Sequence, residues 1–160
     1  MSAPNPPAGY HSLTPSIIVR DAASAIDFYT RAFGAEEVSR MPAPDGKLMH
    51  AELRFGDSTL MLADENPEWG LKSPLSTSGN PGSLHLYVAN ADDAVARAVA
   101  AGCTVQYPLE DTFWGDRYGK VVDPYGHEWG IAHRIRDMSP QEMQAAGEAF
   151  MAAKAQGQPA

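Results

Sequence analysis

The sequence predicts an α+β fold of two pseudo-symmetric βαβββ modules that form a cupped mixed sheet, with their helices outside and a further C-terminal helix. Two observations predict this fold. A helix-capping residue and a closing glycine recur at similar spacing, as Asp21 with Gly34 and as Asn90 with Gly102, and the caps lie 69 residues apart. A turn before a final strand also recurs 70 residues later. A repeat of this length that occurs only twice favours paired modules over a solenoid.

The first module is expected over residues 13–64, after a flexible lead-in. Residues 1–12 contain three prolines and no hydrophobic periodicity. A strand is expected over 14–19. Asp21 is then expected to cap a helix that Gly34 ends, because apolar side chains recur between them every three or four residues.

Three further strands complete the first module in this prediction, at 36–41, 49–55 and 58–63. In the middle strand, odd-numbered residues from position 51 are apolar and even-numbered ones are polar, as in a strand that is buried on one face. Its polar face carries His50, Glu52 and Arg54.

The second module is expected over residues 83–136, after a linking loop at 65–82 that is rich in Pro, Gly and Ser. A strand over 83–88 precedes the helix between Asn90 and Gly102. The module ends in a hairpin over 113–132. Its turn is Asp123-Pro124-Tyr125-Gly126, in which proline fixes its own φ and glycine tolerates positive φ.

Residues 137–160 predict a separate C-terminal helix and tail. Ser139, Pro140 and Glu142 form the pattern of an N-cap serine, a proline at the first helical position and a capping-box glutamate. The modest apolar stripe of this helix is expected to pack on the domain or on a partner subunit, and its end is expected to fray.

Composition and charge limit the classes of molecule that the protein is expected to bind. The formal charge is −8, with 20 acidic and 12 basic residues, so nucleic acid is an unexpected ligand because phosphate binding needs clustered Lys and Arg. No apolar run is long enough for a membrane span, and the first residues lack the pattern of a secretory signal. We therefore expect a cytoplasmic protein. The single cysteine, Cys103, is expected to be a buried apolar side chain rather than a nucleophile.

The apolar faces of the strands must pack on the helices, so the remaining faces are expected to line a concave interior suited to a small molecule. The residues expected on these inward faces are Thr14, Ser16, His50, Glu52, Leu60, Leu62, Ser83, His85, Tyr87, Glu128 and Gly130. Trp114, Tyr118 and Trp129 offer flat faces, of which Trp129 is expected in the core and Trp114 in a loop.

Several segments resemble the vicinal oxygen chelate superfamily, which holds glyoxalase I, bleomycin-resistance proteins and extradiol dioxygenases. They are SIIVRDAASAIDFYTRAFGAE, HAELRFGDSTLMLAD, SLHLYV and above all FWGDRYGKVVDPYGHEWGIA. The hairpin and the Ser-Pro opening of the last helix are similar to the PhnB-like group, over residues 13–150. The resemblance implies the paired βαβββ fold. It leaves the function open, because metal-dependent enzymes and metal-free binding proteins share this scaffold.

The resemblance also implies where metal ligands would stand: near the start of each module's first strand and in its last strand. The corresponding residues are Thr14 and Leu60 in the first module and Ser83 and Gly130 in the second. Metalloenzymes of the superfamily carry His, Gln or Glu there, because divalent cations need nitrogen or oxygen donors. Leu and Gly supply no donor, so the first hypothesis has no metal cofactor.

Under this first hypothesis the protein binds a small molecule, cationic or aromatic, and is a homodimer like the bleomycin-resistance proteins that it resembles. The expected ligand-binding residues are Thr14, His50, Glu52, Leu60, Ser83, His85, Tyr87, Trp114, Arg117 and Glu128. Structural roles compete for several of them, such as ion pairs for Glu52 and Arg117 and a hydrogen-bonded ring for His85.

The second hypothesis is a metal-dependent lyase, isomerase or dioxygenase. His50, Glu52, His85 and Glu128 would form an offset site for zinc, nickel or iron. These residues come from separate strands and lack a short-spacing metal signature.

Overall fold

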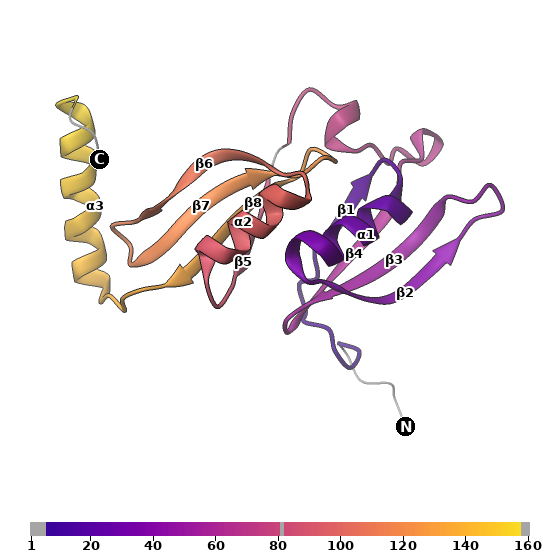
Figure 1. The fold of residues 1–160 in the computed structure, drawn as a ribbon, viewed down its shortest axis with the longest axis horizontal. Helices are drawn as coiled ribbons and strands as arrows, with labels where there is room; N and C mark the ends of the chain where they lie inside the picture. The colour runs from indigo at the N-terminus through magenta and orange to yellow at the C-terminus, as the bar shows by residue number, and fades with distance from the viewer. Residues whose placement is uncertain (1–5, 81, 158–160) are drawn as a thin grey trace.

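The computed structural model describes residues 6–80 and 82–157. It contains two four-stranded mixed sheets, each with one α-helix, and a separate C-terminal helix (Figure 1). The predicted α+β class and the duplicated βαβββ order are confirmed. The first five residues of the expected lead-in, one residue of the linking loop and the last three residues of the expected tail lie outside the described residues.

The first module contains β1 (Ser16–Val19), α1 (Ala22–Phe33), β2 (Glu36–Pro42), β3 (Leu48–Phe55) and β4 (Ser58–Asp64). Its strand order is β1-β4-β3-β2. β1 runs parallel to β4, whereas β3 is antiparallel to both of its neighbours. The predicted caps are confirmed: the Asp21 side chain accepts a hydrogen bond from the Ser24 N–H at 3.0 Å, and Gly34 has a left-handed φ of 71°.

The second module contains β5 (Ser83–Tyr87), α2 (Ala91–Ala101), β6 (Thr104–Asp111), β7 (Asp116–Val122) and β8 (Glu128–Arg134). Its strand order, β5-β8-β7-β6, repeats that of the first module. Asn90 caps α2 by accepting from the N–H groups of Asp92 and Asp93. The expected hairpin turn lies between β7 and β8. The linking loop contains two short 3₁₀ helices, η1 (Pro67–Trp69) and η2 (Pro74–Ser76).

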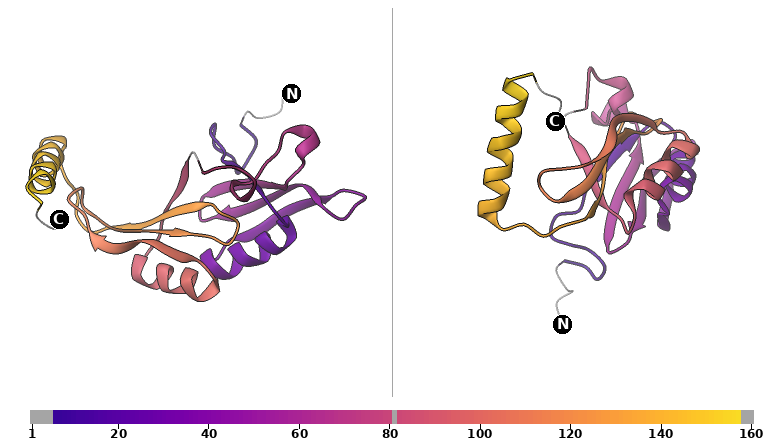
Figure 2. Two further views of the ribbon diagram at one scale, coloured as in Figure 1. Left: turned by 90° about the horizontal axis from the view of Figure 1, so that it is seen from above. Right: turned by 60° about the vertical axis from the view of Figure 1, so that its left-hand side comes forward.

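The two modules pack through their helices. Figure 2 shows α1 and α2 on one side of the molecule, with both sheets on the other side of them. Hydrogen bonds across the junction fix this arrangement. The Tyr29 hydroxyl of α1 donates to Asp123 Oδ2 at 2.7 Å, and the His127 ring lies 2.9 Å from the Ile18 carbonyl oxygen. Arg97 of α2 donates to two carbonyl oxygens at the end of α1, at 2.7 and 3.2 Å.

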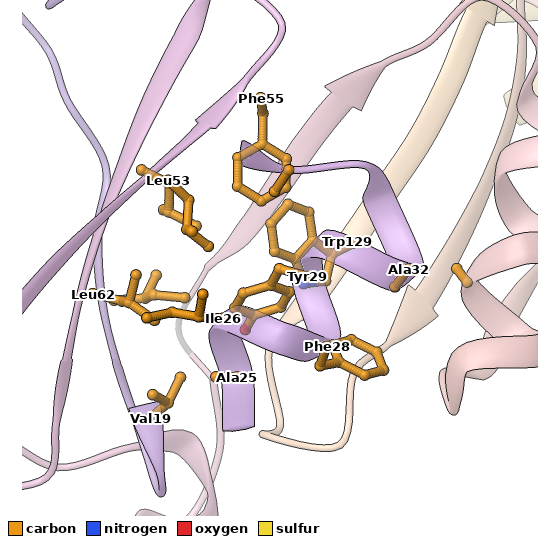
Figure 3. Packing of buried hydrophobic residues seen from close by; sticks show 14 of the residues in the cluster. Val19, Ala25, Ile26, Phe28, Tyr29, Ala32, Leu53, Phe55, Leu62 and Trp129 are labelled. Atoms are coloured by element: carbon orange, nitrogen blue, oxygen red, sulfur yellow. The ribbon is translucent and has the colours of Figure 1, made fainter. Parts of the chain in front are cut away.

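The hydrophobic core lies between the sheets and the helices and continues across the junction. Figure 3 shows Tyr29 of α1 beside Trp129 of β8, with Phe55 of β3 beyond it. The ring centroids of Trp129 lie 5.4 Å from those of both Tyr29 and Phe55. The expectation that Trp129 lies in the core is confirmed, since it is 3% exposed and packs against Tyr29 and Phe55.

The C-terminal helix α3 (Pro140–Ala155) begins as predicted. Ser139 and Glu142 make both hydrogen bonds of a capping box. No residue of α3 is buried. It contacts the second module through Phe150, whose ring centroid lies 5.0 Å from that of Phe113. In Figure 2 it stands at the far end of the molecule from the first module. None of the helices within residues 6–80 and 82–157 combines the length and apolar character needed to cross a bilayer.

The Glu65 carboxylate connects the linking loop to the first module. Because this carboxylate titrates, the stability of the fold is expected to depend on pH. Its carboxylate accepts from the Ser73 N–H at 2.8 Å and the Ser73 hydroxyl at 2.5 Å, and it pairs with Arg20. The hydrogen bonds from Ser73 and Ser76, foremost among its interactions, lower the pKa of Glu65 from 4.5 to about 2. Because the folded pKa is depressed, this stabilisation is present above about pH 4.5 and is lost as pH falls toward about 2.

We therefore expect Glu65→Gln to lower the free energy of unfolding more at about pH 6 than at about pH 3. Urea unfolding of the parent and the variant at several pH values measures this difference. Glu68→Gln, at an exposed position of η1, is the control and should give a small difference that is independent of pH. A Glu65→Gln difference that stays constant with pH would contradict the expectation.

Candidate functional site

The sheet face of the second module, opposite α2, carries a group of aromatic rings. Strand register places His85 beside Gly130 and Tyr87 beside Ala132, with Tyr118 across from Ala132 on β7. The rings of His85 and Tyr118 are parallel within 5°, with centroids 5.7 Å apart. Tyr87 lies 4.8 Å from His85, and Trp114 lies 5.7 Å from Tyr118. We call His85, Tyr87, Trp114 and Tyr118 the platform.

Gly130 makes room for the platform. A Cβ atom at this position would lie 2.9 Å from Tyr118 Cε2, closer than real Cβ atoms approach other atoms, and 3.1 Å from His85 Nδ1, which is a tight contact. Two rings therefore occupy the space into which a side chain of residue 130 would project. Because Gly130 is the implied metal-ligand position of the second module, the platform stands where the metalloenzymes carry a ligand side chain.

Charged pairs flank the platform. At one end, Lys120 Nζ lies 3.0 Å from Glu128 Oε2, and the hydrogen bond from Lys120 lowers the pKa of Glu128. At the other end, the Tyr87 hydroxyl donates to Asp116 at 2.9 Å, and this bond raises the pKa of Tyr87. Asp116 is 1% exposed and pairs with Arg134 at 3.1 Å. The hydrogen bond to Asp116 thus fixes the Tyr87 side chain, while more than half of the residue's surface remains accessible to solvent.

The corresponding face of the first module carries a hydrogen-bonded trio. The Glu52 carboxylate accepts from the Tyr10 hydroxyl and lies 3.0 Å from His50 Nε2. Hydrogen bonds from His50 and Tyr10 lower the pKa of Glu52, and the bond to Glu52 raises the pKa of Tyr10. Tyr10 belongs to the segment expected to be a flexible lead-in. Within this segment, the Gly9 carbonyl oxygen also accepts from the Thr59 hydroxyl at 3.1 Å.

The expected inward position of Leu60 and Leu62 is wrong. Antiparallel partners share a face, and Leu60 pairs with Leu53 while Leu62 pairs with Ala51. All four are buried in the helix-facing core. Met61 is the residue at the middle of β4 on the sheet face, where it lies beside Ser16 and opposite Glu52.

The remaining expected site residues are scattered. Ser83 is exposed beside Glu128 at the start of β5. Arg117 lies on the helix-facing side of β7, where it pairs with Asp92 at 2.6 Å and with Asp111 at 2.9 Å. These pairs hold Arg117 away from the platform.

The donor set does not fit a metal of the superfamily's usual kind. The equivalent residues of the two last strands are Met61 and Gly130, because each pairs with the equivalent residue of its first strand, Ser16 or His85. Met61 offers only a thioether sulfur, and Gly130 has no side chain. Neither supplies the nitrogen or oxygen donor that divalent ions prefer. Within one chain the offset set is divided: His50 and Glu52 meet on one sheet, while His85 and Glu128 belong to the other. Within the described part of the chain, no three His, Cys, Asp or Glu side chains are grouped for a metal.

A cleft of about 490 Å³ lies at the junction of the modules, beside the free edge of β5. It brings together four of the expected site residues: Thr14, Leu60, His85 and Tyr87. A second hollow, of about 720 Å³, lies under the N-terminal segment, and Thr14 and Glu52 line it together with Met61.

Sequence reasoning missed Tyr10, Lys120 and Met61. Tyr10 gave no signal, because a tyrosine in a proline-rich segment lacks periodicity. The face on which Met61 lies could have been predicted from the sequence. A two-residue turn at Gly56-Asp57 pairs Phe55 with Ser58, and this pairing fixes every later partner.

Comparisons with known proteins agree with the fold. The family model of the glyoxalase/bleomycin resistance protein/dioxygenase superfamily matches residues 10–131. An uncharacterised protein of Mycobacterium bovis, Mb0911c, is 50% identical over 138 residues, which cover 84% of this chain and 91% of that protein. The crystal structure of the At5g48480 product of Arabidopsis thaliana has a TM-score of 0.64 and 28% identity, covering 77% and 98% of the two chains.

A PhnB protein of Bacillus cereus shares the fold with a TM-score of 0.60 at 20% identity, over 77% of this chain and 99% of that one. The platform hairpin, the duplicated βαβββ order and the family model therefore point to one conclusion. The chain belongs to the glyoxalase/bleomycin resistance protein/dioxygenase superfamily.

Proposed function

We propose that this protein binds a small planar molecule on the platform without a metal cofactor. The observation that carries the proposal is made at Gly130. The rings of Tyr118 and His85 fill the space into which a metal-ligating side chain would project from this position. Aromatic rings with polar groups at their edges favour flat ligands, which they contact through the ring faces. The surface is acidic overall, with a formal charge of −8, so a neutral or cationic ligand is favoured over an anionic one.

The proposed binding site includes a second copy of the chain. The platform and the Tyr10–Glu52–His50 trio belong to different sheets of one chain, and both sheets lie on the same side of α1 and α2 (Figure 2). A two-fold partner laid on this side would bring its first module over the platform and enclose the ligand. We also propose a cytoplasmic location, because the single cysteine, Cys103, cannot form an internal disulfide, which fits a reducing compartment.

The experiment uses proflavine, a planar aromatic cation, as the probe in fluorescence titrations of the purified protein. We expect Trp114→Leu and Tyr118→Leu to weaken proflavine binding by about tenfold or more, because each removes a ring face. Trp69→Leu is the matched control. Trp69 is 67% exposed in the linking loop and should leave the affinity unchanged within about twofold.

Equal effects of Trp114→Leu and Trp69→Leu would overturn the proposal. So would metal analysis of protein purified without chelators that finds one tightly held divalent ion per chain, lost in His50→Ala or His85→Ala. That result would favour the metal-dependent enzyme over the metal-free binding protein.

A further inference from the structure

The cleft at the module junction is chemically different from the platform. Its walls come from both modules: the segment before β1 and the β3–β4 turn on one side, and the edge of β5 on the other. The apolar side chains that line it are Leu13, Phe33, Phe55, Leu60, Leu84, Leu86, Val88 and Trp129. A cavity of about 490 Å³ with this lining is within the usual size of small-molecule sites.

The floor of the cleft is formed before any ligand arrives. The Trp129 ring centroid lies 4.5 Å from that of Phe33 and 5.4 Å from that of Phe55. Trp129 Nε1 donates to Asp123 Oδ2 at 2.9 Å, which fixes the orientation of the indole. Trp129 is 3% exposed, so the floor is part of the folded core and does not collapse into the space above it. A preformed site avoids the cost of ordering side chains when a ligand binds.

Strand β5 separates the cleft from the platform. Its side chains alternate, so that Leu84 and Leu86 lie on the helix-facing side with Trp129 and Ile131, and His85 lies on the sheet face over Gly130. Only His85 and Tyr87, at the strand edge, line the cleft and also belong to the platform. A ligand in the cleft therefore packs against a different set of side chains from a ligand on the platform.

The rim of the cleft is polar and acidic. Thr14, Ser58 and Thr59 supply hydroxyl groups, and Asp57 in the β3–β4 turn supplies a carboxylate. The described lining includes no Lys or Arg, and its two imidazoles are His11 and His85. An anionic head group beside Asp57 would meet a carboxylate with no Lys or Arg next to it, whereas an ammonium or a neutral hydrogen-bond donor would meet acceptors.

We propose that the cleft is a second binding site, for an amphiphile with an apolar body and an amine or neutral hydrogen-bonding head group. The body lies on Phe33 and the leucines of β5, above the buried Trp129, and the head lies at the rim beside Asp57. Leu13, which is 88% exposed at the rim, gains an apolar partner when the cleft is filled. This site shares His85 and Tyr87 with the platform of the proposed function, but it does not use Trp114 or Tyr118.

The probes are Nile red, a neutral apolar dye whose fluorescence rises in apolar surroundings, and three eight-carbon competitors. Octylamine carries a cationic head, octanol a neutral one and octanoate an anionic one. We expect Nile red to bind the full-length protein and to be displaced by octylamine most readily, then octanol, and least by octanoate. The order follows from the single carboxylate, Asp57, in a described lining that has no Lys or Arg.

Two variants locate the site. Asp57→Lys should lower the affinity for octylamine by about tenfold and raise the affinity for octanoate. The affinity for octanol should change by less than about twofold. Asp45→Lys is the matched control, since Asp45 is also an exposed aspartate beside a turn glycine but lies outside the cleft lining. Val88→Trp should weaken Nile red binding by about tenfold by filling the cleft, and Trp69→Leu, outside the cleft lining, should leave it unchanged within about twofold.

Equal responses of octylamine to Asp57→Lys and Asp45→Lys would overturn the proposal. It would also fail if Nile red did not bind and Val88→Trp converted a dimer to monomers in sedimentation, because the cleft would then be a seam between subunits. Loss of Nile red binding in Tyr118→Leu but not in Val88→Trp would place the dye on the platform and reject the cleft site.

Discussion

Asp123→Ala is expected to lower the free energy of unfolding by about 3–5 kcal/mol. Asp123 is 4% exposed and accepts four hydrogen bonds. Its Oδ1 accepts from the N–H groups of Tyr125 and His127, each at 2.9 Å. Its Oδ2 accepts from the Tyr29 hydroxyl at 2.7 Å and from Trp129 Nε1 at 2.9 Å.

The expected loss is large because the four donors belong to different parts of the fold. Two of them shape the β7–β8 turn, one is the indole of the junction core, and one comes from α1 of the other module. Removing the carboxylate leaves buried donors without an acceptor, and each such group costs about 1–3 kcal/mol. Asp123→Asn should recover only part of the loss, since an amide offers a donor where Oδ2 now accepts.

Urea unfolding followed by circular dichroism measures this loss. Asp45→Ala is the control: its carboxylate accepts one hydrogen bond, from the Lys47 N–H at 3.1 Å, in an exposed turn. The control should lose no more than about 1 kcal/mol. A loss in Asp123→Ala as small as that of the control would show that the carboxylate does not hold the two modules together.

Asp123 also shows which features the sequence could predict. The Asp-Pro-Tyr-Gly pattern predicted its turn correctly, because turn chemistry depends on neighbouring residues. Its bond to Tyr29 joins residues 94 positions apart, and no local pattern encodes such a pair. The same limit applies across the fold. Helix caps and alternating strands were predicted closely, whereas the packing of one module on the other was not.

The same distinction between local pattern and long-range pairing applies to the candidate site. The alternation along β5 predicted that His85 and Tyr87 lie opposite Leu84 and Leu86, which β5–β8 pairing confirms. The error at Leu60 came from treating β4 on its own, although its hairpin with β3 sets its faces. The predicted pair of βαβββ modules is present as two mixed sheets, and the modules join through α1 and α2.

Gly130→Glu places a carboxylate at the implied metal-ligand position, and we expect it to destabilise the protein without creating a metal site. The added Cβ would lie 2.9 Å from Tyr118 Cε2, so the Tyr118 and His85 rings must move. Forcing atoms into packed space costs about 1–3 kcal/mol, and a buried charge adds to this. Gly79→Glu is the control, because no heavy atom lies within 4 Å of a Cβ there, and it should change stability by about 0.5 kcal/mol or less.

Shortening Tyr118 tests whether the ring is the obstacle. Gly130→Glu combined with Tyr118→Ala should recover at least about half of the stability lost in Gly130→Glu, a coupling that only neighbouring residues show. Unfolding experiments give this coupling, and calorimetry with zinc or nickel ions tests for metal. If Gly130→Glu alone is as stable as the parent and binds one ion that His85→Ala abolishes, the platform is no barrier to metal. A destabilised Gly130→Glu that binds no ion would instead mean that the two rings block metal binding at this position.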